Sequence, residues 1–192
     1  MFAEANEDFW EAVMTPNGNG LVMQRENAST GTAEDIVFRA LTDTALEIVS
    51  ATRAQETQAR PSPDGRWVAF QSNASGVNQV VVQPLRGPGG QVVVSTGFGT
   101  EPVSPRTGNR LYYRDGTQFV EVTYTATPQF AVTSRTPFFP DPFVFAPSPH
   151  ANYDVSPDGA TFLALRPTES ARLVFVHNWR SELRRQLASR RR

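Results

Sequence analysis

A Ser-Pro-Asp-Gly turn occurs twice in this chain, at residues 62–65 and 156–159, each time just before a short apolar run. Weaker copies start at Thr15, as Thr-Pro-Asn-Gly, and at Ser104, as Ser-Pro-Arg-Thr-Gly. The four starts are 47, 42 and 52 residues apart. A repeat of this length, with a turn and several β-rich runs in every unit, is typical of propeller blades and other stacked repeats.

Short runs rich in β-branched and aromatic residues follow each turn, and further turn residues separate them. This pattern predicts antiparallel strands. The expected strands cover residues 20–24, 35–40 and 46–49 in the first unit, 66–72, 79–85 and 91–95 in the second, 110–114, 119–124 and 129–133 in the third, and 152–155, 161–166 and 173–176 in the fourth. A helix is expected only after Asn178, where Trp179, Leu183 and Leu187 recur at four-residue spacing.

The predicted fold class is therefore all-β: a partial β-propeller of about four antiparallel blades with a short C-terminal helix. The expected propeller domain spans residues 1–178. Its blades are expected at about 9–50, 51–95, 96–136 and 150–178, with a loop rich in proline and phenylalanine at 137–149 and a helix with an arginine-rich tail at 179–192.

The residues needed for several kinds of chemistry are missing. The sequence contains no cysteine and no lysine, which excludes disulfides, zinc–thiolate sites and catalytic or phosphate-binding lysines. It also contains no kinase catalytic loop and no Gly-x-Ser-x-Gly nucleophile turn. The two histidines, His150 and His177, have no second histidine at ligand spacing. We therefore expect no enzymatic activity from this chain, no catalytic residues, no cofactor and no metal.

Three aspartates recur at corresponding turns: Asp64, Asp115 and Asp158. A ring of carboxylates could bind a cation, but no Ca²⁺-binding loop pattern is intact. The favoured interpretation is that each side chain accepts hydrogen bonds from backbone N–H groups of its own turn.

Two segments are candidate interaction sites. Phe138, Phe139, Phe143 and Phe145 lie in the expected loop, where they could pack over the propeller or present an apolar patch to a partner. Residues 179–192 carry six arginines and one glutamate, so that Arg184, Arg185, Arg190, Arg191 and Arg192 could bind an anionic partner or form a solvated tail.

The chain resembles the carboxy-terminal part of a TolB-like, six-bladed type of β-propeller. More narrowly, it is similar to the propeller region behind many bacterial serine/threonine protein kinases and related regulators. The matching segments are residues 62–70, 87–90, 94–97, 111–116, 153–159, 178–179 and 182–183, and the similarity covers about residues 10–187. Arg106 and Thr107 depart from the pattern at the third turn, so an irregular corner is expected there.

This resemblance implies a non-catalytic sensor or interaction module that binds a protein or a small ligand as part of a larger signalling protein. The alternative is the propeller portion of a kinase or propeller-type peptidase whose catalytic domain is absent from these 192 residues. Nucleic-acid binding through the basic tail ranks third. Relatives suggest an extracytoplasmic location, although Met1 begins an acidic segment without signal-peptide features and no apolar stretch is long enough to span a membrane. Because four blades leave open edges, pairing of two copies is also expected.

Overall fold

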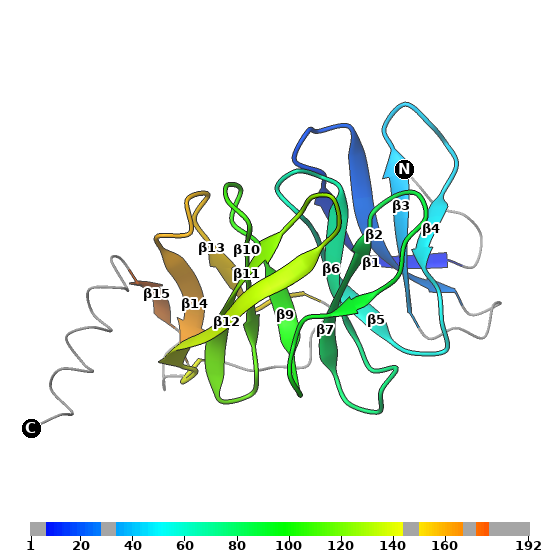
Figure 1. Cartoon of the computed structure of the whole chain (residues 1–192). Coiled ribbons are helices and arrows are strands. Elements are labelled where there is room, and N and C mark those ends of the chain that lie inside the picture. Colours follow the sequence, from blue (N-terminus) through cyan, green and yellow to red (C-terminus); the bar gives the residue numbers. More distant parts are fainter. Residues whose placement is uncertain (1–6, 28–33, 144–149, 167–171, 177–192) are drawn as a thin grey trace, which may run out of the picture.

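The computed structural model describes residues 7–27, 34–143, 150–166 and 172–176, and all the regular elements within these ranges are β-strands. They form four antiparallel sheets, each built from strands that are consecutive in the sequence (Figure 1). This architecture confirms the predicted fold class, and we call the sheets blades 1 to 4. The described residues contain no helix long and apolar enough to cross a membrane.

The strands of each blade follow one another in space in chain order. Blade 1 contains β1 (Glu7–Met14), β2 (Gly20–Asn27), β3 (Asp35–Ala40) and β4 (Glu47–Ser50). Blade 2 contains β5 (Glu56–Pro61), β6 (Trp67–Ser72), β7 (Gln79–Pro84) and β8 (Val92–Val93). Blade 3 contains β9 (Thr100–Val103), β10 (Arg110–Arg114), β11 (Gln118–Thr125) and β12 (Ala131–Pro140). Blade 4 contains β13 (Tyr153–Val155), β14 (Phe162–Arg166) and β15 (Arg172–Val176).

Every strand expected from the sequence overlaps an observed one. The structure adds a strand before the repeated turn in blades 1, 2 and 3, namely β1, β5 and β9. The largest difference concerns β12, which continues through Pro140, whereas residues 137–149 were expected to form a loop. The prolines at 137 and 140 are tolerated because β12 is an edge strand that pairs only with β11, so their missing N–H groups break no second ladder.

The repeated turn is held by its own side chains. In blade 2, the Ser62 hydroxyl donates to the Asp64 carboxylate at 2.5 Å and accepts the Trp67 N–H at 3.0 Å. The hydroxyls of Thr15 and Ser156 accept the N–H groups of Gly20 and Thr161 in the same way. The third turn differs, because there the Thr107 N–H donates to the Pro157 carbonyl of blade 4.

The three turn aspartates accept backbone N–H groups, which confirms their predicted local role. For Asp64, burial raises the pKa, but hydrogen bonds from Ser62 and Arg66 outweigh it and leave the pKa below its usual value. A hydrogen bond from Ser156 lowers the pKa of Asp158. Because a lowered pKa favours the folded state only while the carboxylate is charged, this contribution to stability is lost as the pH falls through the folded-state pKa.

Gly65 provides a direct test of the turn geometry. Its φ is +69°, and a Cβ at this position would meet only Pro16, at 4.0 Å. We expect Gly65→Ala to lower the free energy of unfolding by about 1–2 kcal/mol, because a left-handed conformation is strained for an L-residue. Urea denaturation measures this change. Gly90 has open space and no positive φ, so Gly90→Ala is the control and is expected to change stability by less than about 0.5 kcal/mol. Equal losses in both variants would contradict the argument.

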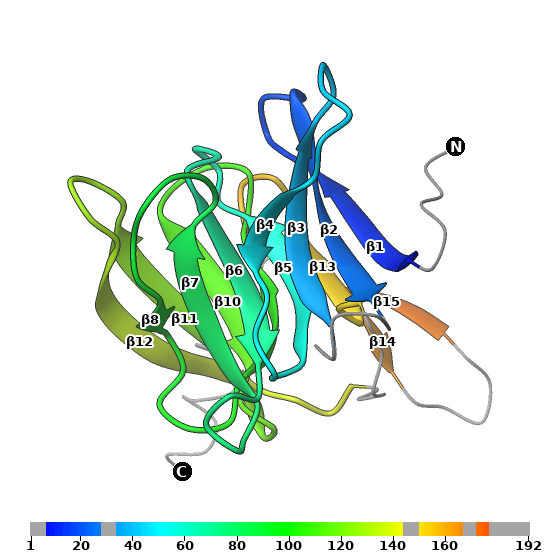
Figure 2. The same ribbon diagram turned by 90° about the vertical axis from the view of Figure 1, so that its right-hand side faces the viewer.

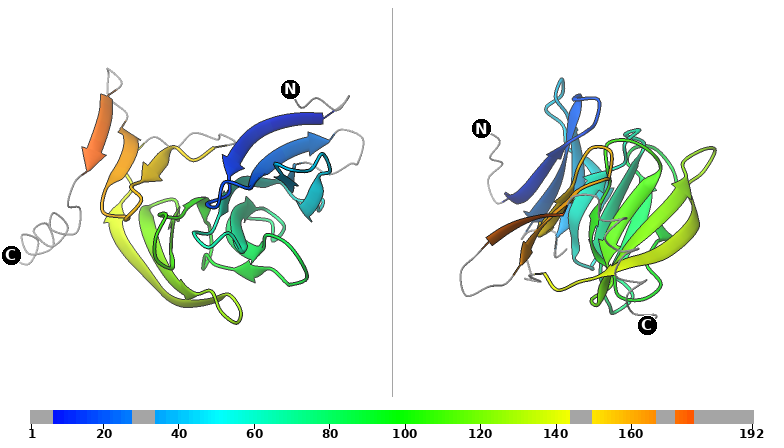
Figure 3. Two further views of the ribbon diagram at one scale, coloured as in Figure 1. Left: turned by 90° about the horizontal axis from the view of Figure 1, so that it is seen from above. Right: turned by 90° about the vertical axis from the view of Figure 1, so that its left-hand side faces the viewer.

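The four blades lie side by side in an arc, with blades 1 and 4 at its two ends (Figures 2 and 3). In blades 2 and 3 the first strand packs against the preceding blade: β5 contacts β1, β2 and β3, and β9 contacts β5, β6 and β7. These first strands are irregular. A β-bulge interrupts the pairing of β1, β5 and β9 with their neighbours, and Gln58 and Glu101 in the last two have φ of 58° and 53°.

The apolar core lies between successive blades and not within one of them, as expected for sheets that bury both faces. One cluster joins blades 1 and 2 around Val22 and Phe70. A second joins blades 2 and 3 around Val80 and Tyr124. The third, between blades 3 and 4, is mainly aromatic and includes Phe119.

Candidate functional site

A cavity of about 570 Å³ lies where the repeated turns of blades 1, 2 and 3 converge, and we call it the mouth cavity. Blade 1 contributes the end of β1 and the turn after it, and blade 2 contributes Arg60, Pro61 and Pro63. Blade 3 contributes residues 103–106, and blade 4 contributes Asp154. The site is therefore a product of the repeat, because equivalent segments of successive blades approach one another around a common centre.

Prolines form much of the wall. Pro16, Pro63 and Pro105 each follow the Ser or Thr that opens a repeated turn, and all three line the cavity. Proline has no N–H to donate, so this wall offers apolar contact and few hydrogen-bond donors. In the sequence, the signal for this wall is the Ser/Thr-Pro pair that opens each turn, and this pair by itself predicts only the turn.

Charged groups stand among these apolar residues. Arg60 Nη2 donates to Glu11 Oε1 at 2.7 Å, and Nη1 donates to the Ala59 carbonyl at 2.9 Å, so this guanidinium is held between blades 1 and 2. Arg106 and Asp154 are exposed, and they give the cavity one further charge of each sign.

A series of buried hydrogen bonds, which we call the polar network, links the four blades. The Gln24 side chain accepts the Gln58 N–H at 3.2 Å, and the Gln58 side chain accepts the Glu101 N–H at 2.8 Å. The Glu101 carboxylate accepts the Asn152 N–H at 2.7 Å. Each of these hydrogen bonds joins a side chain of one blade to the backbone of the next. The polar network therefore fixes the position of each blade relative to its neighbour.

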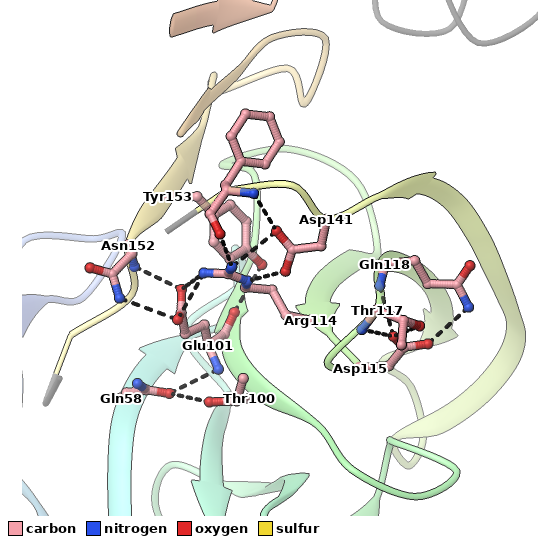
Figure 4. A network of polar contacts seen from close by, with 11 residues as sticks. Gln58, Thr100, Glu101, Arg114, Asp115, Thr117, Gln118, Asp141, Asn152 and Tyr153 are labelled. Atoms are coloured by element: carbon pink, nitrogen blue, oxygen red, sulfur yellow. Dashed lines mark hydrogen bonds and ion pairs between the residues drawn. The ribbon is translucent and has the colours of Figure 1, made fainter. Parts of the chain in front are cut away.

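The polar network ends in a cluster of charged side chains between blades 3 and 4 (Figure 4). Arg114 contacts Asp141 through two nitrogens, with Nε donating to Oδ2 at 2.5 Å and Nη2 to Oδ1 at 3.0 Å. Its Nη1 donates to Glu101 Oε1 at 3.1 Å. Burial, followed by the Glu101 charge, raises the pKa of Tyr153 well above its ordinary value, so its hydroxyl stays protonated and donates to the Glu101 carbonyl. Arg114 and Glu101 are about 1% exposed, so the cluster holds the blades together and is closed to ligands.

The structure places three of the four candidate phenylalanines against the core. Phe138 is 5% exposed and packs against the ring of Phe162 at 5.3 Å. Phe139 and Phe143 are half-buried, and their ring centroids lie 4.6 and 6.1 Å from that of Phe119. All three pack into the aromatic cluster between blades 3 and 4, Phe138 and Phe139 from β12 and Phe143 from the segment that follows it.

The other predicted site residues fall outside the described ranges. These are Phe145, His177, the helix and tail at 179–192, and with them Arg184, Arg185, Arg190, Arg191 and Arg192. His150 is described and exposed. Within the described ranges, no group of three or more His, Asp or Glu side chains could hold a metal ion.

Solved structures with a similar arrangement of blades identify the fold. The structure of TolB from Acinetobacter baumannii matches with a TM-score of 0.65 and 16% identity over 90% of this chain. The chain has a TolB-like β-propeller fold. Two peptidases contain a similar propeller. Prolyl oligopeptidase B from Galerina marginata has a TM-score of 0.57 at 14% identity over 91% of the chain, and a puromycin-hydrolysing peptidase of Mycobacterium tuberculosis has 0.59 at 12% over 89%.

The propeller described here spans only part of each of these proteins: 41% of the TolB chain, 26% of the oligopeptidase and 28% of the puromycin-hydrolysing peptidase. No family model matches the sequence, and no curated protein matches it. At these identities the comparison establishes the propeller fold.

Proposed function

We propose that this propeller is a non-catalytic interaction module that binds a protein ligand at the mouth cavity. The observation that carries the proposal is the cavity itself, whose volume of about 570 Å³ lies within the range of ligand pockets and which draws its lining from all four blades. A site assembled from equivalent turns on a rigid scaffold is preorganised, so a ligand need not order it on binding.

The lining indicates the chemistry of the ligand. Val103 and the prolines favour an apolar segment, because they offer no hydrogen-bond donors from their side chains. The exposed guanidinium of Arg106 favours a carboxylate nearby, since arginine pairs well with this group. We therefore expect a short apolar segment that carries a carboxylate, either on a side chain or at a C-terminus.

Selection of random heptapeptides displayed on phage against the purified chain tests this proposal. We expect enrichment of apolar peptides with an acidic group, and at least tenfold weaker binding of the selected peptides by Arg106→Glu, because the variant reverses the charge at the cavity. Arg53→Glu is the matched control, since Arg53 is exposed in the segment between β4 and β5, outside the cavity lining. Peptides bound equally well by wild type and Arg106→Glu would place the binding site elsewhere.

A second candidate function is that of the propeller portion of a larger enzyme. The similarity to two peptidase propellers favours a peptidase over the kinase suggested by the sequence motifs. The reading frame around this sequence discriminates between the two proposals: an adjoining hydrolase or kinase domain would support the enzyme, and an adjoining domain without catalytic residues would support the interaction module.

A further inference from the structure

Hydrogen bonds align blade 1 with blade 2 residue by residue. In both blades, the hydroxyl that opens the repeated turn accepts the N–H of the residue five positions later. In both, the carbonyl just before that residue accepts the N–H of the residue that follows the third strand. The equivalent pairs are Thr15 and Ser62, Asn19 and Arg66, Gly20 and Trp67, and Leu41 and Leu85. Blade 1 therefore has a glycine where blade 2 has a tryptophan.

The tryptophan of blade 2 closes the space between blades 2 and 3. Trp67 Nε1 donates to the Ala126 carbonyl at 3.2 Å, and the Trp67 ring centroid lies 5.5 Å from that of Phe130. Arg66 Nη2 donates to the same carbonyl at 2.6 Å. The space left beside these side chains is only about 10 Å³, which is room for one water molecule at most.

The equivalent space between blades 1 and 2 is open. It is a cavity of about 580 Å³, which we call the side cavity. Its lining includes equivalents of residues around the small space between blades 2 and 3: Thr15 for Ser62, Phe38 for Val82 and Leu85 for Tyr124. A tryptophan does not fit in place of Gly20, because a Cβ there would lie 2.4 Å from the Phe38 ring and 2.9 Å from the Arg39 carbonyl oxygen. No side chain at this position therefore fills the side cavity.

The lining of the side cavity favours an aromatic ring. Leu41 and Leu85 provide an apolar wall, and Leu41 is 52% exposed. The Arg86 guanidinium lies 5.2 Å from the centroid of the Phe38 ring, and two hydrogen bonds to Glu47 fix its orientation. Because the Arg86 side chain is still 59% exposed, a further ring has room to stack on this guanidinium, and cations attract aromatic faces.

We propose that the side cavity binds an aromatic side chain of a polypeptide partner, with indole as the ring that matches it best. An indole on a polypeptide backbone is the group with which blade 2 fills the equivalent space. Asn17, Asn19 and Thr42 are exposed at the side cavity, where their side chains can form hydrogen bonds with the peptide groups that flank the bound residue.

This site is a second one, and it does not depend on the function proposed for the mouth cavity. The two cavities share Thr15 and Gly18, but Arg106 lines only the mouth cavity and Arg86 only the side cavity. Each site can therefore be tested without the other.

Titration of the isotope-labelled chain with N-acetyl-tryptophan amide, followed by amide chemical shifts, tests the proposal. We expect saturable shifts at residues that line the side cavity, and about fivefold weaker binding of N-acetyl-leucine amide, because leucine has no ring to stack on the guanidinium. Leu41→Ser should weaken binding of the tryptophan amide about fivefold, since it removes part of the apolar wall. Val77→Ser is the matched control: Val77 is 51% exposed, much as Leu41 is, but lies outside the lining of the side cavity.

Trp67→Gly tests the equivalence of the two blade interfaces. The variant gives blade 2 the residue that blade 1 already has, so it should open a second aromatic site between blades 2 and 3. We expect it to bind two molecules of the tryptophan amide per chain, where the wild type binds one. One molecule per chain of a variant that a thermal melt shows to be folded would contradict the argument from the repeat.

The wild-type titration decides the proposal whether or not Trp67→Gly folds. A titration without saturable shifts would overturn it, and so would shifts that Leu41→Ser leaves unchanged. Shifts centred on Val103 and Arg106 would also overturn it, because they would assign the aromatic ring to the mouth cavity. None of these results bears on the carboxylate preference that Arg106→Glu tests, so failure of one proposal is distinguishable from failure of the other.

Discussion

Replacing Arg114 by methionine should lower the free energy of unfolding by about 3–5 kcal/mol, because removing one partner of a buried ion cluster leaves the opposite charges uncompensated. The guanidinium contacts both Glu101 and Asp141, and all three side chains are at most 4% exposed. Methionine fills much of the same space but provides none of the donors. Two carboxylates would then remain buried without a cation, so the loss should exceed that of an ordinary hydrogen bond.

Urea denaturation of the wild type and the variant measures this difference. Arg86→Met is the matched control, because Arg86 pairs with Glu47 through two nitrogens at the surface, where its side chain is 59% exposed. We expect that control to change stability by about 1 kcal/mol or less, as is usual for exposed ion pairs. Similar losses in the two variants would mean that the buried cluster contributes no more than a surface pair.

Phe119→Ala should have the second large effect, a loss of about 3–5 kcal/mol, because it removes a large side chain from a packed core. Phe119 is fully buried, and its ring lies 4.8 Å from that of Tyr153 and 6.1 Å from that of Phe162, so one side chain joins β11 to two strands of blade 4. The cavity left by alanine would lie at the interface between blades 3 and 4.

Hydrogen exchange measured along the chain shows which blade loses stability in the Phe119→Ala variant. Hydrogen exchange of the Phe119→Ala variant is expected to show faster exchange in β13 and β14 than in blade 1, because the third apolar cluster is what holds blade 4. Phe98→Ala is the control, since Phe98 is 37% exposed, and it should cost about 1 kcal/mol or less. Uniformly faster exchange throughout the chain would contradict a local role.

Much of the fold could be predicted from the sequence because its signals are local. The Ser-Pro-Asp-Gly turns form through contacts between residues at most five positions apart, such as those of Ser62 with Asp64 and Trp67. The strands that follow them have β-branched runs, and β7 is an example. These properties depend on nearby residues alone, so they were visible without a structure.

The strands that precede the turns in blades 1 to 3 were not predicted, for a physical reason. β5 contains Gln58 at positive φ, a bulge and a terminal proline, so it lacks the alternation that marks a strand. β9 has Glu101 at the corresponding bulge. These strands are stabilised by neighbouring blades, through contacts to residues more than 30 positions away, such as that of Gln58 with Gln24.

Whether a feature could be predicted from the sequence or only seen in the structure depends on the range of the interactions that produce it. Turn chemistry and strand propensity act over a few residues, so the repeat, the β-class and the number of blades could be recognised in the sequence. The pairing of Arg114 with Glu101 and Asp141, the burial of Phe138 and the convergence of three proline turns on one cavity depend on contacts between blades. Such contacts exist only after the chain has packed, since it is packing that brings distant residues within reach and removes water from between them.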